Sequence, residues 1–150
     1  MVQKIDVTIA KLRLLLADVT AKEQQYTTVR QQFRDQLRRA VEFSVYGDSS
    51  LDTTLGLMAE IQQRIADAEG TIRDLTLIRT RAERELESLQ LTRRIEAAKT
   101  ELQQLITRQH ELEQAGTLGP DSEELRVQIR RLRQQINEAS EQAARTLTRR

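Results

Sequence analysis

The sequence lacks several residue types that most folds need. Its 150 residues include no cysteine, no tryptophan, one proline, one histidine, five glycines, two tyrosines and two phenylalanines. The absence of cysteine excludes a disulfide scaffold and a cysteine-based metal site. The shortage of turn residues argues against an all-β fold, in which a turn interrupts the chain about every 8–12 residues. The scarcity of aromatic side chains argues against an ordinary globular core, so the composition favours long helices.

Charged residues, in contrast, are abundant and nearly balanced, at 31% of the chain with a net charge of +1. The net charge is +3 over residues 1–46 (8 basic, 5 acidic), −4 over 47–115 (9 and 13) and +2 over 116–150 (7 and 5). An acidic helix between two basic ones would favour their pairing. No signal-peptide pattern is present, and no apolar run approaches the roughly 20 residues of a membrane span. We therefore expect a cytoplasmic protein.

Two clusters of helix-breaking residues divide the chain, one at 46–50 and one at 116–121. Their glycines and proline are Gly47, Gly116, Gly119 and Pro120. Glycine closes helices and proline prevents their continuation. Ser49 and Asp121 have the side chains expected of helix N-caps. The sequence predicts one coiled-coil domain over 1–150, with helices at about 2–45, 50–115 and 121–148.

Apolar residues recur at alternating spacings of three and four in each predicted helix, as in the narrow seam of a coiled coil. The first row is Val2, Ile5, Ile9, Leu12, Leu16, Val19, Glu23, Tyr26, Arg30, Phe33, Leu37 and Ala40, in which Glu23 and Arg30 are faults. The second is Thr54, Met58, Ile61, Ile65, Ala68, Ile72, Leu75, Ala82, Leu86 and Leu89, and after a slip of phase Ile95, Ala98, Leu102, Leu105 and Leu112. The third is Leu125, Ile129, Leu132, Ile136, Ala139, Ala143 and Leu147.

Short connections make successive helices antiparallel neighbours. Folding back at the first break pairs residue i with roughly residue 97 − i, and folding back at the second pairs it with roughly 236 − i. Two hairpins that share the middle helix would account for the slip of phase. The sequence therefore predicts an all-α fold of three long helices forming antiparallel coiled-coil hairpins on a central long helix, as an elongated rod or thin bundle.

The first helix carries a second apolar row, which we call the outer row. Its members are Val7, Ala10, Leu14, Ala17 and Ala21. A two-helix hairpin needs only one seam, so this row would either pack in a local three-helix region or be buried in a homo-oligomer. A third alternative is a membrane-surface helix, because Lys4, Lys11 and Arg13 flank the row. Asp6 and Asp18 make that alternative less attractive on anionic lipid.

Two further groups are candidates for contact with a protein partner. The small-residue row is Gly56, Ala59, Ala66 and Gly70, which would let another helix approach closely or would simply be tolerated within the helix. The tip residues are Phe43, Tyr46 and Leu55, beside the first turn. These would form either a docking site or the small core of the tip itself.

The third helix carries a basic group that would either contact phosphates or form a solvated charge stripe. This arginine patch comprises Arg126, Arg130, Arg131 and Arg133, and Arg149 and Arg150 end the chain. No aromatic residue is interleaved for base stacking. If these arginines contact phosphates, the chain would be a nucleic-acid-associated protein, which is one alternative function.

Residues for catalysis, cofactors or metals are not recognisable in the sequence. The single histidine, His110, cannot supply the two Glu-x-x-His pairs of a di-iron bundle, and no phosphate-binding, dinucleotide-binding or zinc-protease motif occurs. We expect no enzyme, no cofactor and no small-molecule substrate. The favoured reading is a non-catalytic structural or adaptor coiled coil that self-associates or docks to a larger assembly. A peripheral membrane protein that uses the first helix is the second alternative.

Overall fold

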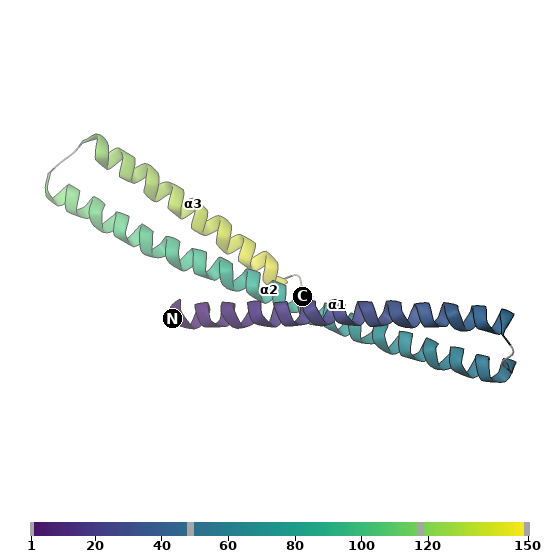
Figure 1. The fold of residues 1–150 in the computed structure, drawn as a ribbon. Helices are drawn as coiled ribbons and strands as arrows, with labels where there is room; N and C mark the ends of the chain where they lie inside the picture. Colours follow the sequence, from purple (N-terminus) through teal and green to yellow (C-terminus); the bar gives the residue numbers. More distant parts are fainter. Residues whose placement is uncertain (1, 48–49, 117–118, 149–150) are drawn as a thin grey trace. The chain divides into compact units, whose positions relative to one another are not determined.

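The computed structural model describes residues 2–47, 50–116 and 119–148, which form three α-helices and their connecting turns (Figure 1). Helix α1 spans Val2–Tyr46, α2 spans Leu51–Gln114 and α3 spans Pro120–Thr148. Each helix boundary lies within one residue of its predicted position. The helices pack against one another, which confirms the predicted all-α fold. Their length follows from the sequence, because glycine and proline are nearly confined to the two breaks.

The packing divides the chain into two compact units. One unit runs from Leu12 to Glu83 and holds most of α1 with the first half of α2. The other combines the start of α1, up to Lys11, with the chain from Arg84 onward. Helices α1 and α2 are uninterrupted, so each contributes to both units.

The Leu12–Glu83 unit is built on the two predicted apolar rows, which face each other across α1 and α2. Its buried apolar side chains are Val19, Ala40, Ile61, Ala68 and Ala82. All five belong to the predicted rows. Tyr26 was also predicted in the row, but it is exposed, because a tyrosine at the edge of a two-helix seam keeps its hydroxyl in water. Val29 and Phe33 are half-buried one and two turns further along.

The second unit buries Ile9 of α1, Leu91 of α2, and Leu125 and Ile129 of α3. Leu91 follows the buried Ala82 by nine residues, which is a rotation of about 180° around an α-helix. The side of α2 that is buried therefore changes between the two units. This change of buried side explains the phase slip in the sequence, where one apolar row stops after Leu89 and another resumes at Ile95.

The helix ends correct the predicted cap of the third helix and leave that of the second untested. The predicted cap Ser49 lies outside the described residues, and the hydroxyl of Ser50 accepts the backbone N–H of Thr53 at 3.3 Å. Helix α3 begins at Pro120, so Asp121 lies in the first turn and is not the cap. Proline suits that first position, because its missing N–H has no intrahelical partner there in any case. Gly116 closes α2 as expected, with a φ of 71°.

Candidate interaction surfaces

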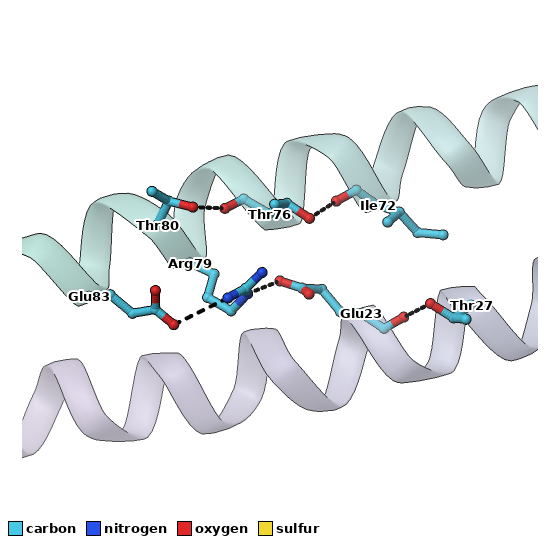
Figure 2. A network of polar contacts seen from close by, with 7 residues as sticks. All are labelled: Glu23, Thr27, Ile72, Thr76, Arg79, Thr80 and Glu83. Carbon is cyan, nitrogen blue, oxygen red and sulfur yellow. Dashed lines mark hydrogen bonds and ion pairs between the residues drawn. The ribbon is translucent and has the colours of Figure 1, made fainter. Parts of the chain in front are cut away.

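A three-residue ion-pair network joins α1 to α2 in the Leu12–Glu83 unit (Figure 2). Arg79 donates from Nε to Glu23 Oε1 at 2.9 Å, and from Nη1 to Glu83 Oε1 at 3.2 Å. Figure 2 shows the guanidinium lying between the two carboxylates, one from each helix. Glu23 is the more enclosed partner, since its side chain is 18% exposed against 34% for Arg79.

The network explains why a charged residue stands in the apolar row of α1. Glu23 interrupts the apolar row of α1, and Arg79 occupies the corresponding position of α2 between Leu75 and Ala82. The hydrogen bonds that Arg79 donates to Glu23 and to Glu83, together with the charges of both carboxylates, raise the pKa of Arg79 above its ordinary value. Both carboxylates thus stabilise the cationic form of Arg79. Sequence analysis missed this residue, although its spacing in the row was the available signal.

Neighbouring hydroxyls are satisfied within their own helices. Thr76 donates to the carbonyl of Ile72 and Thr80 to that of Thr76, both at 2.9 Å, while Thr27 donates to the carbonyl of Glu23 at 2.8 Å. Threonine commonly satisfies its hydroxyl this way inside helices. These groups therefore need no ligand, and the network has the character of a structural ion pair.

The ion pairs between α1 and α2 also fix the register of the two helices. Arg34 pairs with Glu69 at 3.1 Å in the Leu12–Glu83 unit, and Asp6 pairs with Arg93 at 3.3 Å in the other unit. The rule 97 − i predicted that residue 23 would lie opposite residue 74, residue 34 opposite residue 63, and residue 6 opposite residue 91. The observed partners lie five, six and two positions further along. Every Cα–Cβ bond leans toward its helix N-terminus, so side chains that meet in an antiparallel pair come from later positions on the returning helix.

The outer row lies on the side of α1 opposite the buried row and is exposed along its whole length. Val7 is 53% exposed and Leu14 is 73% exposed, and the three alanines of the row are exposed as well. Each described residue of the outer row is thus left unburied by the core of its own unit. The role of the outer row as a contact surface remains a prediction.

The small-residue row is similarly open. Gly56, Ala59 and Ala66 are exposed and Gly70 is half-buried. A Cβ atom added at either glycine would meet no other heavy atom within 4 Å. No helix of the described chain therefore uses the close approach that these glycines permit.

The tip residues have more exposed apolar surface than their position beside a turn requires. Phe43 is 58% exposed, Tyr46 is 88% exposed and Leu55 is 52% exposed, and Val45 and Leu51 are exposed beside them. The tip therefore does not enclose these side chains in a small core of its own. Several exposed apolar side chains beside one turn are candidates for an interaction site.

The arginine patch is exposed, but its four members do not share one face. Arg126, Arg130 and Arg133 follow one another at spacings of four and three, whereas Arg131 points to another side of α3. Within the described ranges, none of the four forms an ion pair. Arg149 and Arg150 lie outside the described residues.

Comparison with known proteins yields no match: no family model, no curated protein and no solved structure matches the chain. Of the helices in the described ranges, none has an apolar stretch sufficient to cross a bilayer. The proposed function therefore rests on the exposed residues described above.

Proposed function

We propose that the chain is a non-catalytic structural or adaptor coiled-coil protein that acts by self-association or by docking to a larger assembly. The observation that carries this proposal is the amount of apolar side chain left in solvent on helices whose own seams are already filled. Val7 and Leu14 on the outer row and Phe43 and Tyr46 at the tip are all more than half exposed. Large exposed apolar surfaces usually mark protein contacts.

The ionisable groups support a structural role over a chemical one. Within the described ranges, the ion pairs of Arg79 with Glu23 and Glu83 raise its pKa, which moves it further from neutral pH. General acid–base chemistry needs a group whose pKa lies near the working pH. The proposal is therefore of a scaffold whose polar contacts set helix register.

The test is the mass of the full chain in solution over a wide range of concentrations. We expect sedimentation equilibrium to give a mass that rises above the 17.3 kDa of one chain as the concentration increases. In parallel, the immobilised chain should retain a defined protein from an extract, and a Phe43→Ser/Tyr46→Ser variant should lose it. A strict monomer that also retains no protein would contradict the proposal.

A second candidate function follows from the three aligned arginines of α3. Arg126, Arg130 and Arg133 are exposed on one helix face without ion-pair partners in the described chain. Such a face can neutralise phosphates, and the resulting affinity falls steeply as salt is raised. Nucleic-acid binding that disappears in an Arg126→Gln/Arg130→Gln/Arg133→Gln variant and weakens with salt would support this function. Binding that survives several-fold higher salt would not.

A further inference from the structure

We infer that the outer row of α1 pairs with the same row of a second copy of this chain, in parallel and in register. The inference deepens the proposed self-association and rests on it: it names the partner, the face and the orientation. The outer row lies on one uninterrupted helix and is exposed throughout, as described above.

The outer row follows a seven-residue repeat. Val7, Leu14 and Ala21 recur every seven residues, and Ala10 and Ala17 lie three residues after the first two. These are the a and d positions of a heptad, whose side chains meet when two helices wind around each other. The small alanines permit a close approach of the two backbones.

The charges that flank this row specify the orientation. In a parallel pair, the residue just before each a position meets the residue five places later on the other helix. These positions hold Asp6 against Lys11 of the second copy, and Arg13 against Asp18. Both contacts join opposite charges, and the two-fold symmetry repeats each of them, which gives four attractive contacts.

An antiparallel pair would form fewer favourable contacts between the same residues. It would align Lys11 with Asp18 twice, but it would place Arg13 against Thr20 and Val7 against Gln24. A parallel pair instead brings Val7 to Val7 and Leu14 to Leu14. The charge pattern and the apolar layers therefore favour the same arrangement.

The flanking side chains are available for these contacts. In the described part of the chain Lys11 and Arg13 have no ion-pair partner. Asp18 bonds Lys22 within the helix at 3.2 Å, but its side chain is 61% exposed, so it remains open to a second cation. Asp6 turns its buried Oδ1 toward Arg93 while 42% of its side chain stays exposed, which leaves the other oxygen for Lys11 of the second copy.

Charge exchange in the full-length chain tests the orientation. Arg13→Glu and Asp18→Arg each convert two attractive contacts of the parallel pair into repulsive ones, so each should raise the dimer dissociation constant by about tenfold. A 1:1 mixture of the two variants should recover the wild-type constant, because each repulsive contact is replaced by an attractive one. Arg131→Glu, an exposed position of α3 with the same change in charge, is the matched control. All are measured by sedimentation equilibrium, with helicity checked by circular dichroism.

Cross-linking gives an independent measure, since the chain has no cysteine of its own. Val7→Cys should form a disulfide-linked dimer under mild oxidation, because the two copies of residue 7 meet in a parallel pair. An antiparallel pair would separate them by about 25 Å along the helix axis. Val127→Cys is the control, since Val127 of α3 is 50% exposed and should cross-link only at the background rate.

The outcomes separate this inference from the proposed function. A concentration-dependent mass that is insensitive to Arg13→Glu and Asp18→Arg would overturn the inference while self-association through another face stands. A dimer that Asp18→Arg weakens and Arg13→Glu does not would show antiparallel pairing and would also overturn it. A strict monomer at about 0.5 mM, well above the micromolar constants of ordinary specific complexes, would overturn the inference and leave only docking to a different protein.

Discussion

Glu23 and Arg79, which each interrupt the apolar row of their own helix, lie opposite each other and are joined by a 2.9 Å hydrogen bond. Two polar residues in a seam between helices are costly when they are unpaired and nearly neutral when they are paired. Their value lies in specificity, because a shift of α1 along α2 by one turn would separate them. The pair thus selects one register among several that the apolar rows would tolerate.

This role predicts opposite effects for single and double substitutions at the pair. Glu23→Leu should lower the thermal midpoint, because it leaves Arg79 in the seam with only the exposed Glu83. Glu23→Leu/Arg79→Leu should raise the midpoint above that of the wild type, because both faults are then filled by apolar side chains. Thermal unfolding followed by circular dichroism measures both, and Arg73→Leu serves as control at an exposed arginine of α2. If the double variant melted below the single one, Glu23 and Arg79 would have to be stabilising in their own right.

The apolar rows were predictable because spacing alone determines which side of a helix is apolar. Val19, Ile61, Ala68 and Leu125 are buried in the positions their spacing indicated. The identity of the residue opposite Glu23 was less accessible, because a rule that counts from the turn ignores the lean of side chains toward the helix N-terminus. Adding that lean, about one position for each helix, moves the expected partner from residue 74 toward Arg79 but accounts for only part of the difference.

The buried and exposed isoleucines of α2 should respond differently to the same truncation. Ile61→Ala is expected to lower the free energy of unfolding by about 2 kcal/mol, the low end for such a change, because a gap between two helices partly collapses. Ile78→Ala should change it by less than about 0.5 kcal/mol, since Ile78 is 46% exposed. Urea unfolding monitored by circular dichroism compares the two. Equal losses at both positions would mean that Ile78 is buried in solution, as it would be in an oligomer.

Two glycines should show effects of opposite sign when replaced by alanine. Gly116→Ala should cost about 1 kcal/mol, because φ is 71° there and a Cβ disfavours the left-handed region. Gly56→Ala should gain about 0.5–1 kcal/mol, since Gly56 lies inside α2 with nothing within 4 Å of the added Cβ. Both are measured by chemical unfolding at low protein concentration. A loss at Gly56 would indicate that a close helix contact fills that space.

The candidate interaction surfaces are the features that could be predicted least completely from the sequence. Spacing identified the outer row, but either burial within the chain or exposure agreed with it, because a single helix does not reveal how many neighbours it has. Leu14 is 73% exposed, so the Leu12–Glu83 unit to which it belongs does not bury it. The arginine patch likewise appeared as four residues, and the helical arrangement reduces it to the aligned Arg126, Arg130 and Arg133. The predicted start of α3 was one residue late for a similar reason, because a proline such as Pro120 can begin a helix as well as end one.

The tip residues give a prediction in which stability and function separate. Tyr46 is 88% exposed at the last position of α1, so Tyr46→Ser should change the free energy of unfolding by less than about 0.5 kcal/mol. The same substitution should reduce retention of a partner that docks at the tip by about tenfold, since exposed tyrosines are frequent anchors of protein interfaces. Val127→Ser removes an exposed apolar side chain from α3 and should leave retention unchanged. If both variants bound equally well, the apolar surface at the tip would have no part in docking, and the outer row would be the remaining contact surface.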